Sequence, residues 1–307
     1  MESVVPALVV VFNRPDVTRM LVDNLRTVAP RRLFVAADGP RDNHADDAGR
    51  CHQVRRELER IDWECDVSFL AHDHNLGLQR AMVTAIDWFF GEVEAGIVLE
   101  DDCVVHPDFF DLAAAVLERY ADVREVMYLT ATNMRPDRTF GDGASWHFAS
   151  AGHIWGWATW RRAWEGYDSQ LSDWPSYQHE FGPGQGALRR ALGAKADAAH
   201  RGSKHTWARA WHYHVAKQRG LVAVPATNLV RNVGVGPDAT HTVSRRHSLI
   251  GLPVDSITRP FVAPTRTEPD PGYDAVLTSY HRWGWRRRTR ELARRTFNRP
   301  GGTRHPR

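Results

Sequence analysis

The sequence predicts an α/β protein with a mostly parallel sheet flanked by helices, and three observations support this prediction. Strand-like and helix-like segments alternate over roughly the first 130 residues, which is typical of parallel strands joined by crossover helices. The apolar run ALVVVF at 7–12 is continuous, as expected of a strand covered on both faces. The chain has 307 residues, 42% of them hydrophobic and 25% charged, which suits a large buried core.

Each expected strand is followed by a helical pattern. Pro15 suits the first turn of a helix, and Asp38-Gly39-Pro40 signals a turn after the second strand. In the third helix four apolar side chains are expected to face the sheet: Met82, Ile86, Phe89 and Phe90. The expected strands are 7–12, 32–37, 65–72, 95–102 and 125–131, and the expected helices are 15–26, 46–60, 77–90 and 107–120.

The pattern changes in the second half of the chain. Eight of the twelve tryptophans lie between Trp146 and Trp211, and helices are expected at 154–164, 186–200 and 205–219. Trp157, Trp160 and Trp164 recur at the spacing of one helical face, which favours core packing. Residues 251–280 are rich in proline and are expected to form an extended arm.

Several classes of protein are excluded by motifs that the sequence lacks. No apolar run approaches the roughly 18 residues of a membrane helix, and the first residues resemble a strand rather than a signal peptide. Neither GxGxxG nor GxxxxGK[ST] occurs, which argues against a Rossmann dehydrogenase and a P-loop NTPase. Three cysteines without CxxC spacing suit a reduced compartment, so a cytoplasmic location is expected.

Positive charge is concentrated in residues 281–307, which carry ten arginines and one glutamate, so that the rest of the chain is net negative. Tryptophan, leucine and phenylalanine are interspersed among these arginines, and such a tail could lie peripherally on an anionic membrane surface. A solvated, frayed terminus is the alternative, and both interpretations stay open. Nucleic-acid binding is not expected, because the basic charge is confined to the tail.

Three adjacent carboxylates, Glu100, Asp101 and Asp102, follow the fourth expected strand. Ligands of parallel sheets bind at the carboxyl ends of strands, where Asn13, Asp38 and other polar residues are also expected. In an extended chain Glu100 and Asp102 would point to one side and Asp101 to the other. Like charges at the end of a buried strand call for a cation, and Mg²⁺ or Mn²⁺ prefers such oxygen ligands. The alternative is a solvated acidic turn that caps a helix.

The segment VLEDDCVVHPDFF resembles the DXD segment of GT-A fold glycosyltransferases, in the EDD form of the Golgi glycoprotein β-1,2-N-acetylglucosaminyltransferase. Five further segments match bacterial relatives of that fold in the same order, over roughly residues 5–245. They are VVFNRPD, FVAADGPR, HNLGLQRAMVTAIDWFF, HIWGWATWRRAW and GVGPDATHT. The resemblance implies a GT-A-like catalytic domain over 1–250, with a nucleotide-binding half (1–135) and an acceptor-side half (136–250), followed by the arm and the tail.

The resemblance also implies roles for individual residues. Asp102 would hold Mn²⁺ or Mg²⁺, and the late His241 is a second candidate ligand, although a lone histidine is more often structural. The residues implied in nucleotide binding are Phe12, Asn13, Arg14, Asp38, Asn75, Gly77, Arg80 and Asp101. Trp155, Gly156 and Trp157 would bind the acceptor, since indole rings stack on sugars.

One departure from the resembling enzymes concerns the general base. Where those enzymes carry carboxylates in a Trp-flanked helix start, this sequence has Ala208 and Arg209, and alanine cannot take a proton. His205, His212 and Glu165 are the nearest alternatives. The leading hypothesis is metal-dependent transfer of a sugar from a nucleoside diphosphate, with UDP as the default, to a glycan, lipid-linked or small-molecule acceptor. A non-catalytic nucleotide-sugar- or glycan-binding protein and a sugar nucleotidyltransferase are the alternatives.

Overall fold

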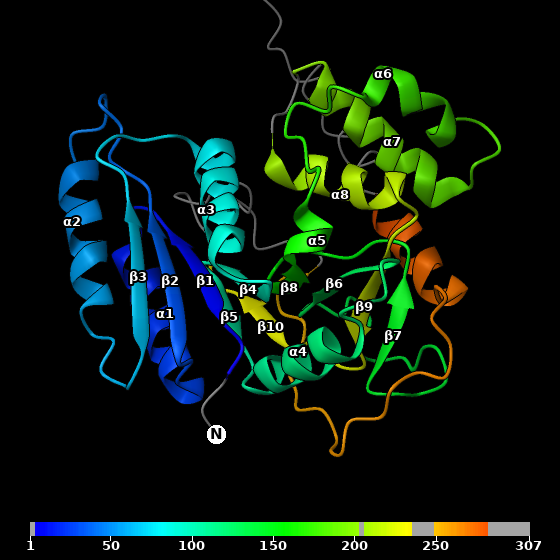
Figure 1. Cartoon of the computed structure of the whole chain (residues 1–307), viewed down its shortest axis with the longest axis horizontal. Helices are drawn as coiled ribbons and strands as arrows, with labels where there is room; N and C mark the ends of the chain where they lie inside the picture. Colours follow the sequence, from blue (N-terminus) through cyan, green and yellow to red (C-terminus); the bar gives the residue numbers. More distant parts are fainter. Residues whose placement is uncertain (1–3, 203–205, 235–248, 282–307) are drawn as a thin grey trace, which may run out of the picture.

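A computed structural model of the protein describes residues 4–202, 206–234 and 249–281. Eight strands form one sheet in the order β3-β2-β1-β4-β8-β6-β9-β7, and β5 pairs with β10 in a small antiparallel sheet (Figure 1). The strands are β1 (Ala7–Val11), β2 (Arg32–Ala37), β3 (Asp66–Ala71), β4 (Ala95–Glu100), β5 (Cys103–Val105), β6 (Val126–Thr130), β7 (Trp146–Ala149), β8 (Trp157–Trp160), β9 (Leu221–Pro225) and β10 (Val230–Asn232).

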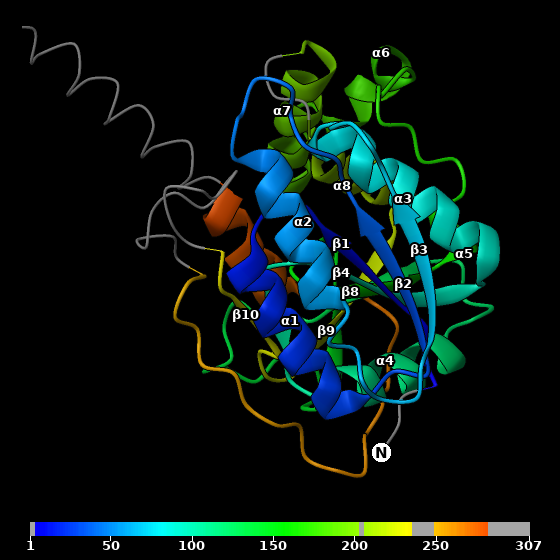
Figure 2. The same cartoon turned by 90° about the vertical axis from the view of Figure 1, so that its left-hand side faces the viewer.

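Helices cover both faces of the large sheet. Figure 2 shows β2 and β3 between α1 and α2 on one side and α3 on the other. The helices are α1 (Pro15–Val28), α2 (Asp47–Leu58), α3 (Leu78–Glu92), α4 (Asp108–Arg119), α5 (Arg161–Trp164), α6 (Trp174–Tyr177), α7 (Ala187–His200) and α8 (Trp207–Lys217), with a 3-10 turn η1 (Gln178–Phe181) and a last helix over 271–281.

The predicted fold class is confirmed. Strands β3, β2, β1 and β4 are mutually parallel, and β6 and β9 run in the same direction, whereas β8 and β7 are antiparallel to their neighbours. The continuous apolar run of β1 is buried, because helices cover both faces. The four apolar side chains expected to face the sheet from α3 are fully buried. Parallel strands place their carboxyl ends at one edge, which gathers the loops after β1, β2, β3 and β4.

The second half of the sheet differs from the prediction. The expected helix at 154–164 is wrong, since Trp157–Trp160 is a strand that fits antiparallel between β4 and β6, and only Arg161–Trp164 is helical. Aromatic and β-branched side chains suit such a strand. The predicted arm also ends earlier than expected, because residues 271–281 form a helix whose Tyr273 and Leu277 are buried. The basic tail lies outside the described residues.

Alternation along β8 places its two tryptophans on opposite faces of the sheet. Trp160 donates its indole N–H to the carbonyl of Leu117 in α4, while Trp157 faces α8 on the other side of the sheet. Trp157 belongs to a group of packed rings that we call the aromatic cluster. It consists of Tyr128, Trp157, Trp164, Tyr167, Trp207 and Trp211, with ring centroids 4.0 to 6.4 Å apart in the contacting pairs.

No helix within the three described ranges is both long enough and apolar enough to cross a membrane.

Candidate active site

The carboxylates Glu100, Asp101 and Asp102, which we call the acidic turn, lie at the exit of β4. Glu100 is the last residue of the strand, and Asp101 and Asp102 turn the chain into β5. The expectation that Asp101 and Asp102 point to opposite sides is wrong, because the turn replaces extended chain. Both carboxylates face Arg14, whose Nε donates to Asp101 Oδ2 at 3.1 Å and whose Nη2 donates to Asp102 Oδ2 at 3.1 Å and to Asp101 Oδ1.

The acidic turn carries more negative charge than Arg14 neutralises. Burial raises the pKa of Glu100, and the neighbouring Asp102 and Asp101 carboxylates raise it further. Burial also raises the pKa of Asp101, although Arg14 opposes this shift. Burial lowers the pKa of the Arg14 guanidinium, but the two aspartates outweigh it, so the pKa lies above its ordinary value. With its pKa raised to about 8, Glu100 keeps its proton at neutral pH, and one guanidinium between the two aspartates leaves a site that favours additional positive charge.

The strand β10 covers the acidic turn from a distant part of the sequence. Asn232 Nδ2 donates to Asp102 Oδ1 at 2.9 Å, and the Val233 amide donates to the Asp102 carbonyl at 2.9 Å. A Cβ on Gly234 would stand 2.1 Å from Asp102 Oδ2 and 2.6 Å from Arg14 Nη1, so a larger residue there would displace these side chains. Sequence reasoning missed Asn232, although it lies two residues before Gly234, where the GVG segment that carried part of the resemblance begins.

The loops after β2 and β3 are tied together by Asp38. Its Oδ1 accepts the amides of Gly39 and Leu76, both at 2.9 Å, and its Oδ2 accepts Asn75 Nδ2 at 2.8 Å. A Cβ on Gly39 would lie 2.5 Å from the main chain of His74. The side chain of Asp38 is buried and shapes the edge of the site, and Oδ2 keeps a lone pair for a further donor.

The other predicted nucleotide residues lie on the same edge. Gly77 has a φ of 76°, which favours glycine, and it starts α3, where Arg80 is exposed. Asn13 Nδ2 donates to Asp47 at 2.8 Å. The Arg41 guanidinium also binds Asp47 and lies 5.4 Å from the centroid of the Phe12 ring.

Asp47 was not predicted from the sequence. It is buried, and its hydrogen bonds with Arg41 hold the pKa of its carboxyl well below the usual range. It therefore acts as a fixed anion that orients Asn13 and Arg41. The segment RDNHADDAG contains several carboxylates, and nothing in that pattern singles out the one that is buried.

The predicted acceptor residues fall into two environments. Gly156 has a φ of 62°, and a Cβ there would stand 3.0 Å from Val105 and 3.4 Å from Leu99, which flank the acidic turn. The neighbouring Trp155 is half-buried, and its carbonyl accepts Thr132 Oγ1. Trp157, by contrast, is 1% exposed within the aromatic cluster, which is the core position that the tryptophan spacing favours. Its side chain is therefore not available as a sugar platform in this structure.

The candidate general bases are not gathered around the acidic turn. Glu165 is exposed and follows α5, which begins where the Arg161 amide binds the carbonyl of Glu94, at the amino end of β4. That edge of the sheet is opposite the site, on the order of 15 Å away along the strand. His205 lies outside the described residues, and α8 carries Ala208 and Arg209 in its first turn, as the sequence indicated.

His212 on α8 is the remaining candidate base. Burial lowers its pKa to about 3, so the imidazole is neutral at neutral pH. Its buried Nε2 has no hydrogen-bond partner among the described residues. A group with such a low pKa is a weak proton acceptor. The described structure therefore supports His212 as a neutral hydrogen-bonding group rather than as an efficient base.

Oxygen ligands of the acidic turn are chemically suited to Mg²⁺ or Mn²⁺, and the surplus negative charge favours such an ion. In the described ranges no group of three or more histidine, cysteine, aspartate or glutamate side chains is arranged to hold a metal. Any ion would therefore depend on few protein ligands, with further ligands from a bound diphosphate. The candidate ligand His241 lies outside the described residues.

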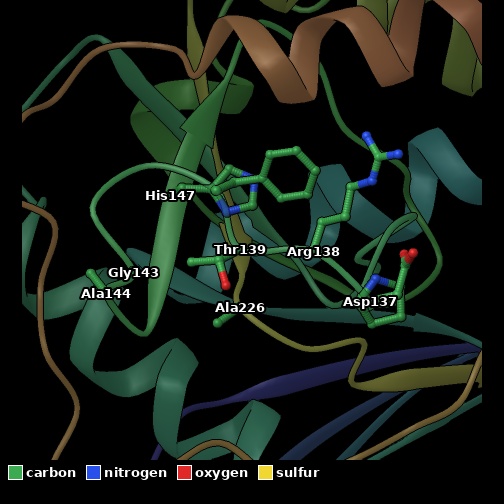
Figure 3. Close-up of a pocket in the computed structure, with 9 residues that line it drawn as sticks. Asp137, Arg138, Thr139, Gly143, Ala144, His147 and Ala226 are labelled. Carbon is green, nitrogen blue, oxygen red and sulfur yellow. The ribbon is translucent and has the colours of Figure 1, made fainter.

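A cavity of about 260 Å³ lies beside β7, four strands away from β4 in the sheet order (Figure 3). Its lining includes Arg138, Phe140 and His147, and none of the predicted site residues. Phe140 and His147 pack against Tyr273 of the last helix. This cavity is therefore separate from the acidic turn.

Comparisons with known proteins agree with this arrangement at the level of the family. The model of glycosyl transferase family 2 matches residues 7–191, which span β1 to α7 and include the acidic turn. No curated protein matches the chain in sequence.

Three solved structures give weak likenesses. A UDP-glucose pyrophosphorylase complexed with UDP-glucose has a TM-score of 0.26 at 10% identity, over 45% of this chain and 61% of that one. A cytidylyltransferase from Leptospira borgpetersenii has a TM-score of 0.34 at 14% identity, over 55% and 65%. A glucose-1-phosphate thymidylyltransferase from Bacillus anthracis, described there as putative, has a TM-score of 0.35 at 10% identity, over 74% and 89%. The matched parts span less than two thirds of the first two of these chains.

The family model covers more than half of the chain, and the large, mostly parallel sheet flanked by helices is the fold that it describes. The chain therefore belongs to glycosyl transferase family 2 and is a glycosyltransferase with a GT-A-like fold.

Proposed function

We propose that the protein transfers a sugar from a nucleoside diphosphate donor, with UDP as the first candidate, to an acceptor hydroxyl with the help of a divalent cation. The observation that carries this proposal is the meeting of Arg14, Asp38 and the acidic turn at the carboxyl edge of β1, β2 and β4. A nucleoside diphosphate has an anionic diphosphate that suits an arginine and hydrogen-bond donors on its base and ribose that suit carboxylates.

The residues take distinct roles in this proposal. Asp38, through its free lone pair on Oδ2, accepts from the base, beside the Phe12 ring. Asp101 binds the ribose, and Asp102 holds Mn²⁺ or Mg²⁺, which neutralises charge on the leaving diphosphate when bound. Asn13, Asn75, Gly77 and Arg80 shape the surrounding loops. The protein would bind a nucleotide-sugar donor, and a glycan, lipid-linked or small-molecule acceptor would bind at Trp155 and Gly156.

Calorimetric titration of the full chain with UDP and with GDP, each with and without Mn²⁺, tests the proposal. We expect one nucleotide to bind, and more tightly with Mn²⁺ present. Release of UDP or GDP from a panel of nucleotide sugars then tests turnover. Failure of both nucleotides to bind in the presence of Mn²⁺ would contradict the proposal.

A non-catalytic donor-binding protein is the second candidate, because Ala208 and Arg209 stand where the resembling enzymes carry carboxylates. Nucleotide binding without transfer or hydrolysis of any donor in the panel would favour it. Turnover that disappears in Asp102→Ala, and persists in Glu165→Gln at the opposite edge of the sheet, would exclude it.

A further inference from the structure

Arg14 occupies the oxygens that a metal ion at the acidic turn would need. Its guanidinium binds both oxygens of Asp101 and also Asp102 Oδ2, while Asn232 binds Asp102 Oδ1. Every carboxylate oxygen of these two aspartates therefore already accepts a hydrogen bond. A hard cation would have to share these oxygens through their second lone pairs, and it would be repelled by the guanidinium at such close range.

The main chain leaves little room for both cations. Gly234 lies so close that a Cβ there would clash with Asp102 Oδ2 and with Arg14 Nη1 at once. The side chain of Arg14 is 19% exposed, whereas those of Asp101 and Asp102 are 5% and 15% exposed. The guanidinium is thus at least as exposed as the two aspartates that it binds.

The main chain of Arg14 is held at the start of α1, whereas its side chain is held by its contacts with Asp101 and Asp102. Its carbonyl accepts both the amide and the hydroxyl of Thr18, each at 2.9 Å, at the start of α1. Movement is therefore confined to the flexible side chain. A diphosphate offers this guanidinium a second anionic partner of suitable bidentate geometry.

We infer that Arg14 holds the acidic turn in the donor-free protein and excludes the divalent cation until the diphosphate draws the guanidinium away. Metal and nucleotide then bind together, and Mn²⁺ alone binds weakly. This inference rests on the proposed function, because it assigns a positioning role to Arg14 within the same site. It makes Arg14 a competitor of the metal in one state and a ligand of the donor in the other.

Titration of the nucleotide-free full chain with Mn²⁺, followed by the electron paramagnetic resonance signal of the free ion, tests the inference. Arg14→Gln should bind Mn²⁺ about tenfold more tightly than the wild type, or more, because the competing guanidinium is gone. The gain should vanish in Arg14→Gln/Asp102→Ala. Arg19→Gln is the matched control, since it removes an arginine of α1, the helix that Arg14 precedes, and this arginine pairs with Glu57 away from the site.

Equal or weaker Mn²⁺ binding by Arg14→Gln would overturn the inference. If loss of the arginine leaves Asp101 unpaired and the variant does not fold, Asp101→Asn is compared with Arg14→Gln/Asp101→Asn, and the double variant should still bind Mn²⁺ more tightly. UDP and GDP titrations of the wild type separate the two proposals. If the wild type binds a nucleotide but Arg14→Gln does not bind Mn²⁺ more tightly, the inference alone is overturned. If Arg14→Gln binds Mn²⁺ more tightly but the wild type binds neither nucleotide, the proposed function is overturned.

Discussion

The edge formed by β1 to β4 and the aromatic cluster are held together by different forces. At the edge, the buried carboxylates of Asp38 and Asp101 bind a main-chain amide and an arginine that are distant in sequence. The buried Asp47 binds Arg41, six residues before it. In the aromatic cluster, indole and phenol rings pack against one another with few charges among them. Binding chemistry and stability therefore reside in different parts of this molecule. Substitutions at the edge should change binding more than stability, and those in the aromatic cluster should do the opposite.

The largest effect is expected in the aromatic cluster. Trp211 is fully buried against Tyr128, Trp157 and Trp164. Trp211→Ala should lower the free energy of unfolding by about 3–5 kcal/mol, because it opens a large cavity. Urea denaturation measures this value, and calorimetry on the folded variant should give unchanged UDP affinity.

The half-buried Trp155 provides the contrast on the acceptor loop. Trp155→Ala should cost less than about 1 kcal/mol of stability and raise the KM for the acceptor. Equal destabilisation by the two tryptophan variants would show that the acceptor loop contributes as much to stability as the aromatic cluster does.

At the acidic turn the expected effect is on turnover rather than on stability. Asp102→Ala should reduce metal-dependent turnover by about a hundredfold or more, because charge on the leaving group is no longer neutralised. The melting temperature should change little, since the substitution removes like-charge repulsion together with the hydrogen bonds from Arg14, Asn232 and Cys103. Activity that survives with its metal dependence intact would place the ion elsewhere.

A substitution at Gly39 should change stability by an amount between those expected for Trp211→Ala and Trp155→Ala. A Cβ there would collide with the His74 main chain, so Gly39→Ala should cost about 1–3 kcal/mol and weaken nucleotide binding by displacing the Asp38 loop. Gly49→Ala is the matched control, because a Cβ at that helical position meets nothing within 4 Å. It should be neutral or slightly stabilising. Similar losses in the two variants, measured by thermal denaturation, would contradict the packing argument.

The last effect concerns the pH dependence of stability. Burial lowers the pKa of His147 to about 4, whereas an unfolded histidine titrates near its ordinary value of about 6.5. Between these values the unfolded chain takes up a proton that the folded one refuses, so stability falls as the pH falls. The contribution is about 1.4 kcal/mol per pH unit at most.

The readout for His147 is the slope of the unfolding free energy against pH, measured by urea denaturation at several pH values. This slope is compared between the wild type and His147→Gln. Burial raises the pKa values of Glu100 and Asp101, which act with the opposite sign in this range, and the difference cancels them. The lowered pKa of Asp47 acts with the same sign as His147, but only under more acidic conditions, below about pH 4. Identical slopes in the two proteins would show that His147 is not held neutral.

The first half of the fold follows closely from the sequence. Continuous apolar runs gave β1, β2 and β4, and the turn residues placed Arg14, Asp38 and Asp101 at the strand ends where the structure has them. These signals are local, because each strand and the loop that follows it are neighbours in the chain. The family match confirms the glycosyltransferase prediction that the motifs supported.

The second half could not be predicted as well, because its placement depends on contacts between distant segments. Trp157, Trp160 and Trp164 satisfy a helical spacing, yet antiparallel pairing of Trp157–Trp160 with both β4 and β6 makes that segment a strand. Likewise, nothing near Asn232 or Asp47 in sequence indicates that they bind Asp102 and Arg41. The roles of His241 and His205 remain predictions, since both lie outside the described residues.

The crowding of indoles on one side of the sheet has a practical consequence for spectroscopy. Trp157, Trp164, Trp207 and Trp211 are close enough to exchange excitation energy, whereas Trp63 and Trp88 are the indoles that the described chain places beside β1 to β3. Intrinsic emission from this protein will therefore report mainly on the integrity of the ring-packed side. A fluorophore attached near the nucleotide loops would be the better sensor of donor binding.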